Sequence, residues 1–246
     1  MKRILEWQVA TVTAIKEETA RVKTFTLALP NGTSHRAGQH YDIRLIAPDG
    51  YQAQRSYSIA SEPERVGEID LTVERLEDGE VSPYMHDVLV EGDQVEVRGP
   101  IGGYFVWEAG MGGPLFLVGG GSGGVPVMSR IRHRASVGSR VPTRLLYSSR
   151  TPEDVIYAGE LEKLAGSGDG FEVFHTFTRT QPPGWTGYAR RIDSQMLAEV
   201  AGPLGNTPHV YVCGPTLLVE TAANGLVQTG IAPAQIRTER FGPTGK

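Results

Sequence analysis

From Trp7 to about Val106, apolar and polar side chains alternate along short runs that turn residues interrupt. The alternation is clearest in the segments 8–15, 22–29, 41–46 and 69–74. A period of two residues is typical of strands that bury one face. Several such strands in succession predict a closed antiparallel β-barrel.

One helix is expected among these strands, from Ser82 to Val88, with Ser82 as its N-cap and Pro83 at its first position. The residues that lead into it combine a flexible glycine with free backbone N–H groups and a hydroxyl. They are Gly79, Glu80, Val81 and Ser82. Because the N-terminus of a helix attracts anions, this segment is a candidate phosphate site. A plain capped helix is the alternative interpretation.

After Gly103 the pattern changes to longer segments in which strands and helices alternate. Strands are expected at 115–118, 143–147, 171–175, 209–212 and 235–238, and helices near 126–137, 153–165, 193–201 and 215–229. This alternation predicts a parallel sheet with helices on both faces. We therefore expect two domains, residues 1–109 and 110–246. The basic run Arg130 to Arg134 is interpreted as an exposed helix face.

Ligands of such a sheet bind beyond the carboxyl ends of its strands. A glycine-rich stretch that contains Gly121, Ser122 and Gly123 follows the first expected strand, and Pro126 is expected to begin the first helix. Backbone without side chains can approach a pyrophosphate closely there, although the spacing is not that of the common dinucleotide fingerprint. A tight turn between strand and helix is the alternative.

The ends of the second and fourth strands carry further candidates. Ser149 and Arg150 follow the second strand, where the ribose next to adenine usually lies. An arginine there suits a 2′-phosphate and favours NADPH, with Arg179 as a second cation or as an ordinary surface arginine. After the fourth strand come Cys213, Gly214 and Pro215, which place a thiol at the ligand edge, although a lone cysteine is more often a buried structural residue.

Arg55, Ser56, Tyr57 and Ser58 place a cation, an aromatic ring and two hydroxyls on one extended segment. In a strand, Arg55 and Tyr57 point to one face and the two serines to the other. A guanidinium can pair with a pyrophosphate, and a phenol ring can cover an isoalloxazine. The segment is therefore a candidate flavin-nucleotide site, with an ordinary strand end as the alternative.

Composition narrows the range of functions. The net charge is −4, but residues 1–110 hold 11 Lys/Arg against 18 Asp/Glu, while residues 111–246 hold 13 against 10, which suits an anionic ligand in the second half. A single cysteine excludes an internal disulfide and a cysteine-ligated iron-sulfur cluster within these residues. No basic patch indicates nucleic acid, and neither a membrane segment nor a signal peptide is evident. We expect a cytoplasmic protein that uses an organic redox cofactor and no metal.

Taken together, these motifs resemble the ferredoxin-NADP reductase superfamily, in the same order and over nearly the whole chain. The matching residues are Arg55 to Ser58, Gly79 to Ser82, Gly99-Pro100-Ile101-Gly102, the glycine-rich stretch through Pro126, and Cys213-Gly214-Pro215. The resemblance implies a six-stranded antiparallel FAD-binding barrel followed by a Rossmann-like NAD(P)-binding α/β domain.

The resemblance also implies roles for individual residues. Arg55 would contact FAD phosphate, Tyr57 would pack on the isoalloxazine, and Ser58 would lie near flavin N5. Backbone of Thr72, Val73 and Glu74 would pass beside the flavin, Gly79 to Ser82 would complete the pyrophosphate site, and Cys213 would lie near the nicotinamide. Ser58, Cys213 and Glu239 are the expected catalytic residues.

Two departures from the family pattern stand out. The glycine loop usually reads Gly-Gly-Thr-Gly-Ile-Ala-Pro, whereas this chain has Ser122 in place of threonine and Gly124 in place of isoleucine. Gly124 removes a packing side chain. Glu239 and Phe241 resemble an acid-x-aromatic ending whose ring covers the flavin, but here five residues, Gly242 to Lys246, follow the aromatic.

The function expected from the resemblance is an FAD-dependent oxidoreductase that takes hydride from NAD(P)H, with NADPH favoured. Its electrons would pass singly to a separate acceptor such as a ferredoxin, a flavodoxin or an oxygenase component. The alternative is a flavin-binding electron-transfer or regulatory subunit that does not itself oxidise pyridine nucleotide, and the altered loop at Gly124 and Val125 is the feature that favours it. A dinucleotide-binding module without flavin is a third possibility.

Overall fold

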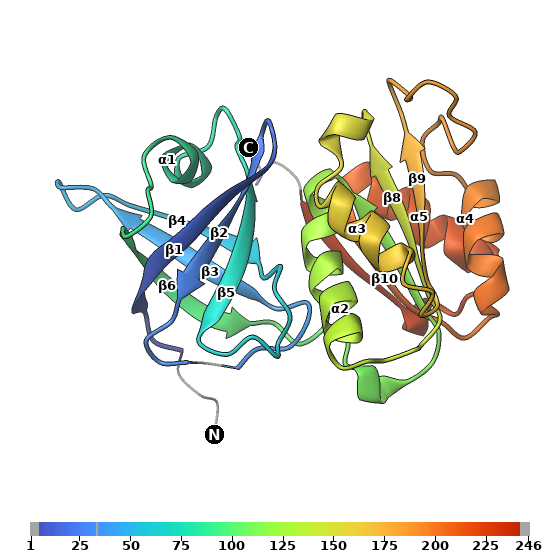
Figure 1. Cartoon of the computed structure of the whole chain (residues 1–246), viewed down its shortest axis with the longest axis horizontal. Helices are drawn as coiled ribbons and strands as arrows, with labels where there is room; N and C mark the ends of the chain where they lie inside the picture. The colour runs from blue at the N-terminus through green and yellow to red at the C-terminus, as the bar shows by residue number, and fades with distance from the viewer. Residues whose placement is uncertain (1–4, 33, 242–246) are drawn as a thin grey trace. The chain divides into compact units, whose positions relative to one another are not determined.

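A computed structural model describes residues 5–32 and 34–241 (Figure 1). The extension Gly242 to Lys246, noted above after the aromatic Phe241, lies outside the described residues. The chain forms two compact units. The first comprises the residues up to Trp107 together with Met128–His133, and the second comprises Glu108–Val127 and the residues from Arg134 onward.

In its described residues the first unit contains a six-stranded antiparallel sheet in the order β4-β3-β6-β1-β2-β5. The strands are β1 (Gln8–Thr19), β2 (Val22–Ala28), β3 (His40–Ile46), β4 (Gln52–Ser58), β5 (Glu68–Glu74) and β6 (Gln94–Ile101). An antiparallel bridge between Ile59, directly after β4, and Leu71 of β5 joins the two ends of this order. The closed barrel predicted from the alternating pattern is confirmed.

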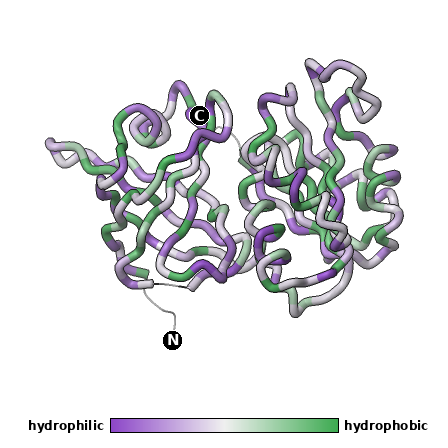
Figure 2. The backbone as a smooth tube through the Cα atoms, viewed as in Figure 1, coloured by the Kyte–Doolittle hydropathy of each residue, from purple (hydrophilic) through white to green (hydrophobic). Residues whose placement is uncertain are grey.

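Alternate strand residues fill the barrel. Phe25 and Leu27 of β2, Tyr41 and Ile43 of β3, and Leu71 of β5 are fully buried and belong to one apolar cluster. The hydropathy colouring changes repeatedly between hydrophobic and hydrophilic along the barrel strands, as the period of two requires (Figure 2). This core holds β4, and with it the Arg55 to Ser58 segment, in a fixed register against β3.

Helix α1 (Val81–Asp87) begins earlier than predicted, with Glu80 rather than Ser82 at its N-cap position and without a side-chain cap. Ser82 lies inside the helix, and its hydroxyl accepts a hydrogen bond of 3.1 Å from the backbone N–H of Leu76. The predicted capping role of Ser82 is therefore wrong. The hydroxyl instead ties the helix to the loop that leads out of β5.

In its described residues the second unit contains a five-stranded parallel sheet in the order β11-β10-β7-β8-β9. Its strands are β7 (Leu115–Gly120), β8 (Thr143–Ser149), β9 (Phe171–Phe177), β10 (His209–Pro215) and β11 (Ile236–Phe241). The chain runs outward from β7 to β8 and β9 and then returns to the other side of β7. The strand order therefore reverses between β7 and β10, where α/β sheets bind ligands.

Helices α2 (Gly124–Ser136), α3 (Ala158–Ala165), α4 (Ser194–Ala201) and α5 (Thr216–Gln228) connect these strands. Met196 and Leu197 of α4 and Ala222 and Leu226 of α5 share one apolar core with Val118 and other sheet residues. Helices α2 and α3 lie on the opposite side of the sheet (Figure 1). The predicted sheet with two covered faces is confirmed. No helix in the described part of the chain has the length and apolar character needed to cross a bilayer.

Two predictions about helices after β7 need correction. Residues 153–157 do not belong to α3, because Thr151 and Asp154 form a capping box around a 3-10 turn and Tyr157 has a left-handed φ of 63°. The basic run on α2 is not an exposed face, since Arg130 and Arg134 are fully buried. The guanidinium group of Arg130 donates a hydrogen bond to the backbone carbonyl of Phe105. That of Arg134 donates to the backbone carbonyls of Val141 and Asp169.

Candidate functional site

The candidate flavin segment lies on β4, and its side chains differ in exposure. Arg55 is exposed and donates through Nη1 to the carbonyl of Gln54 at 2.7 Å. Tyr57 is half-buried against the barrel core, and Ser58 at the end of the strand is buried. The segment therefore presents a cation at the surface, with a ring and a hydroxyl set deeper along the same strand.

Ser56 has a structural partner. Its hydroxyl donates a hydrogen bond of 2.6 Å to Asp42, a buried carboxylate opposite it on β3. Asp42 also accepts from Gln54 Nε2 at 3.0 Å and from Arg98 Nη2 at 2.7 Å. A buried carboxylate needs such donors, because an unpaired charge in the interior is costly. The cofactor contact expected of Ser56 stays a prediction, and the structure gives this residue a role in fixing the strand.

Burial raises the pKa of Tyr57 to about 12, although the nearby charge of Arg55 opposes the shift. The phenol is therefore neutral at any ordinary pH. A neutral aromatic ring that is partly covered by the barrel and partly open suits a flat apolar ring system better than a charged one. This property fits the isoalloxazine contact expected of Tyr57.

The candidate phosphate segment lies close to Arg55 in space. The guanidinium Nη2 of Arg55 is 3.9 Å from Oε2 of Glu80. The other carboxylate oxygen, Oε1, accepts a 2.7 Å hydrogen bond from the hydroxyl of Tyr51. The fold thus brings the Arg55 segment and the segment Gly79 to Ser82 together, as expected, and places Tyr51 beside Glu80. The sequence gives no signal for Tyr51, because an exposed tyrosine beside a turn has many other uses.

The first residues of α1 fit a phosphate group in shape and charge. A Cβ atom on Gly79 would lie 2.9 Å from the Ser82 hydroxyl and 3.1 Å from the carbonyl of Leu76, so only glycine fits without a shift. Arg55 supplies a positive charge, whereas the carboxylate of Glu80 beside it would repel an incoming anion. These residues are compatible with an FAD pyrophosphate, which Arg55 would hold together with backbone N–H groups.

The β5 residues expected beside the flavin already have partners within the barrel. The hydroxyl of Thr72 is 2.7 Å from that of Thr24, and the carbonyl of Val73 is 2.8 Å from Nε2 of His86 on α1. Glu74 ends the strand opposite Val22. His86 therefore connects α1 directly to β5, a link that the sequence analysis missed because the two residues come from different elements.

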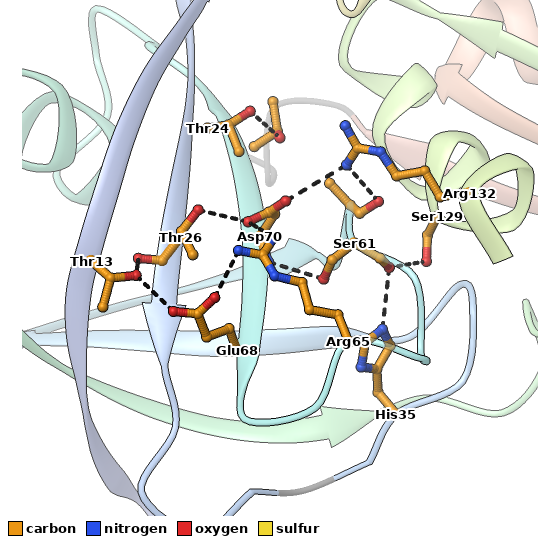
Figure 3. Close-up of polar contacts among 12 residues, drawn as sticks. Thr13, Thr24, Thr26, His35, Ser61, Arg65, Glu68, Asp70, Ser129 and Arg132 are labelled. Carbon is orange, nitrogen blue, oxygen red and sulfur yellow. Dashed lines mark hydrogen bonds and ion pairs between the residues drawn. The ribbon is translucent and has the colours of Figure 1, made fainter. Parts of the chain in front are cut away.

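A polar network fixes the segment that follows Ser58 (Figure 3). Ser61 accepts at its hydroxyl from the backbone N–H of Asp70 at 3.0 Å, and its carbonyl accepts from the hydroxyl of Ser129 at 2.8 Å. Arg65 donates to the carboxylate of Asp70 at 2.8 Å. All of these residues belong to the first unit, which includes residues 128–133. The network holds the chain immediately after Ser58 and so limits the movement of that hydroxyl.

In the second unit, the glycine-rich stretch and the Cys213 segment meet where the strand order reverses. Gly119 of β7 is the register partner of Cys213 on β10. A Cβ atom on Gly123 would collide with the carbonyl of Cys213, and Gly214 has a φ of 154° and faces the backbone of Gly120. Side chains are therefore excluded from this crossing, as expected for a place that a dinucleotide approaches.

Cys213 is fully buried, and its register partner on β11 is Glu239. Phe241, at the end of β11, is opposite Pro215 and is 37% exposed. The fold thus brings the expected catalytic residues Cys213 and Glu239 next to each other on neighbouring strands. Ser58 belongs to the other unit, and its meeting with Cys213 at a flavin stays a prediction.

The two arginines that are candidates for reading a 2′-phosphate lie on neighbouring backbone segments. The backbone N–H of Arg179 donates to the carbonyl of Arg150 at 2.9 Å, and that of Thr178 donates to the carbonyl of Ser149 at 3.0 Å. Both arginine side chains are exposed, and neither has an ion-pair partner among residues 5–32 and 34–241. The Ser149 hydroxyl is buried and without a hydrogen-bond partner in the same part of the chain. Two unpaired cations and an unused hydroxyl suit an anionic ligand at this edge.

Sequence comparison matches two nucleotide-binding domain families to successive parts of the chain. The oxidoreductase FAD-binding domain family matches residues 9–106, and the oxidoreductase NAD-binding domain family matches residues 117–224. The ferredoxin-NADP reductase B of Sorangium cellulosum (strain So ce56) is 34% identical over 211 residues, which cover 83% of this chain and 84% of that protein.

A second relative is the glycine betaine monooxygenase reductase subunit of Pseudomonas aeruginosa (strain UCBPP-PA14). It is 32% identical over 232 residues, and the match covers 93% of this chain but only 62% of the relative. Among solved structures, the flavohem-like FAD/NAD-binding domain of nitric oxide dioxygenase from Vibrio cholerae has a TM-score of 0.85 at 24% identity. That match covers 96% of this chain and 99% of the other, and it shows a shared fold.

The barrel, the parallel sheet and the two family matches define a two-domain flavin- and pyridine-nucleotide-dependent oxidoreductase. The chain belongs to the ferredoxin-NADP reductase superfamily. The resemblance noted from the motifs is therefore confirmed.

Proposed function

We propose that this chain is a reductase that takes hydride from NAD(P)H, with NADPH preferred, and passes the electrons to an acceptor outside these 246 residues. Residues 1–109 would hold FAD and residues 110–246 the pyridine nucleotide. FAD, when bound, supplies the conversion from a two-electron donor to one-electron steps. The observation that carries the proposal is that one chain holds both an exposed Arg55 beside the start of α1, in the first unit, and side-chain-free backbone at the β7–β10 crossing, in the second.

The residues of the chain act by binding and orientation. Arg55 neutralises phosphate charge, and Tyr57 offers a neutral ring to the flavin. The buried Ser58 hydroxyl is held by its strand and by the network around Ser61, so it can offer one fixed hydrogen bond. Cys213 and Glu239 would limit where the nicotinamide lies and exclude water from it. Alignment of donor and acceptor atoms, rather than acid-base chemistry, is the contribution that these residues make.

The acceptor is proposed from chemistry and from one relative. These residues contain a single cysteine and cannot ligate an iron-sulfur cluster by themselves. The relative from Pseudomonas aeruginosa is named as the reductase subunit of a monooxygenase. We therefore propose a ferredoxin, a flavodoxin or an oxygenase component as acceptor, and a cytoplasmic location for the reaction.

An anaerobic absorbance titration tests the proposal. The purified protein should be yellow, and stepwise NADPH should bleach the flavin band without any partner protein, more efficiently than NADH does. Ser58→Ala and Cys213→Ala should keep FAD but reduce it more slowly in stopped flow. Unchanged rates in both variants would remove these residues from the mechanism.

Two other outcomes would contradict the proposal. A yellow protein that NADPH bleaches only when a partner protein is present would favour an electron-transfer or regulatory subunit. A colourless protein that does not take up added FAD would favour a dinucleotide-binding module without flavin.

A further inference from the structure

Tyr147 of β8 contacts the glycine-rich loop that follows β7. Its ring is buried, with 1% of the residue exposed, and its hydroxyl donates a hydrogen bond of 2.9 Å to the carbonyl of Gly121. Gly119 lies opposite Tyr147 in the sheet register, and a Cβ atom on Gly119 would be 3.3 Å from the ring. The tyrosine therefore packs along the base of the loop and bonds to its tip.

The same ring occupies the space beside Gly124. A Cβ atom on Gly124 would lie 2.5 Å from the Tyr147 hydroxyl oxygen and 2.7 Å from Cζ, distances that real Cβ atoms do not show. The side chain that is absent at position 124 therefore leaves no cavity, because Tyr147 fills the volume. Gly124 and Tyr147 therefore form a matched pair, because the Tyr147 ring occupies the space that a side chain at position 124 would need.

We propose that Tyr147 is a positioning residue that holds residues 119–124 in the shape that receives the pyrophosphate of NAD(P)H, an inference that rests on the proposed function. A trans peptide group is planar, with its C=O and the following N–H pointing in opposite directions. The hydrogen bond that draws the Gly121 carbonyl toward Tyr147 therefore turns the N–H of Ser122 away from the ring. That N–H lies one turn ahead of α2, where an anion is favoured.

The backbone of the loop supports the same arrangement. Gly121 has a left-handed φ of 54°, which glycine adopts without strain, and its carbonyl also accepts from the N–H of Gly124. One carbonyl therefore ties the 3-10 turn both to the start of α2 and to β8. Loss of the Tyr147 hydroxyl removes one of these two ties and leaves the other in place. The loop should then sample more conformations without unfolding.

Tyr147→Phe removes the hydroxyl and keeps the ring. The dissociation constant for NADP⁺, measured by calorimetry on the FAD-loaded protein, should rise about two- to tenfold, the range expected for one lost hydrogen bond. The limiting rate of flavin reduction at saturating NADPH and the FAD content should change little. Tyr188→Phe is the matched control, because its hydroxyl donates a 2.8 Å hydrogen bond to Glu199 in the same unit; that variant should bind NADP⁺ as the wild type does.

Gly124→Ala tests the steric half of the pair, since its Cβ must displace Tyr147 or the loop. It should also weaken NADP⁺ binding while FAD content is kept. Wild-type NADP⁺ affinity in Tyr147→Phe or in Gly124→Ala would overturn the inference and leave the proposed function intact. An equal loss of NADP⁺ affinity in Tyr188→Phe would do the same. A lower melting temperature with unchanged NADP⁺ affinity would show a merely structural tyrosine and would overturn it too. Failure of the wild-type protein to bind NADP⁺ would overturn both proposals.

Discussion

The clearest test of nucleotide choice is Arg150→Ala. Arg150 and Arg179 are exposed, and a backbone hydrogen bond of 2.9 Å brings them together at the carboxyl ends of β8 and β9. NADPH differs from NADH by one 2′-phosphate, so a residue that reads this group should affect one nucleotide only. Removal of Arg150 should weaken binding of NADPH and leave binding of NADH nearly unchanged.

The exposure of Arg150 limits the size of the effect. Two unit charges about 4 Å apart interact by about 1 kcal/mol in bulk water and by about 4 kcal/mol near a protein surface. Because solvent surrounds both arginines, we expect the lower part of this range, about 1–2 kcal/mol, or about five- to thirtyfold in the dissociation constant. Added salt should reduce the difference between variant and wild type, since exposed charges are screened.

The assay compares dissociation constants of NADP⁺ and NAD⁺ and the apparent KM for NADPH and NADH in the same protein preparations. Arg140→Ala is a suitable control, because Arg140 is also exposed but precedes the amino end of β8. A loss of equal size for both nucleotides would refute the assignment of Arg150 to the 2′-phosphate. If Arg179 shares the phosphate, the double variant should lose less than the two single losses combined.

Two further predictions concern stability and flavin retention. Burial is the main cause that lowers the pKa of His35, His40, His86 and His175 below 6.5, so the unfolded chain binds more protons than the folded chain once the pH falls under that value. The melting temperature should therefore be highest above pH 6.5 and fall toward pH 5, less steeply in His175→Phe; a flat profile would contradict this sign. His86→Phe removes the hydrogen-bond donor to the Val73 carbonyl, so it should lower the free energy of unfolding by about 1–3 kcal/mol and speed the release of FAD. Tyr84→Ala, on the exposed side of α1, should have neither effect. Equal rates of FAD release in the two variants would contradict a role for the link between His86 and β5.

The alternating pattern was sufficient to predict β1, β2, β3 and β5 of the barrel, because a period of two residues reports directly which face is buried. It did not predict β6. The change to alternating strands and helices predicted the parallel sheet for a similar reason. Local rules failed where a partner lies farther along the chain. Ser82 has the right residue type for an N-cap, yet its hydroxyl binds Leu76. Residues 153–157 follow a helical pattern, yet the 3-10 turn that Thr151 caps ends after Asp154, because the backbone of Val155 is extended.

The same limit explains which site residues the sequence missed. The side chain absent at Gly124 is visible in the sequence, but the residue that fills its space is set by the pairing of β7 with β8. Likewise, Asp42 becomes the partner of Ser56 only through the β3–β4 register. Motif residues at strand ends could be predicted, whereas the residues that support them depend on which strands become neighbours.

The two parts of the proposed NAD(P)H site, the glycine-rich loop and the pair of arginines, also differ in how they depend on side-chain identity. Backbone N–H groups and glycine positions recognise phosphate through the path of the chain, so changes such as Ser122 and Gly124 are tolerated wherever that path is kept. Arg150 and Arg179 are instead proposed to read one specific group, the 2′-phosphate, by charge. Nucleotide preference should therefore be easy to change by substitution at these arginines, whereas nucleotide binding itself should depend on residues such as Tyr147 that hold the loop from outside it.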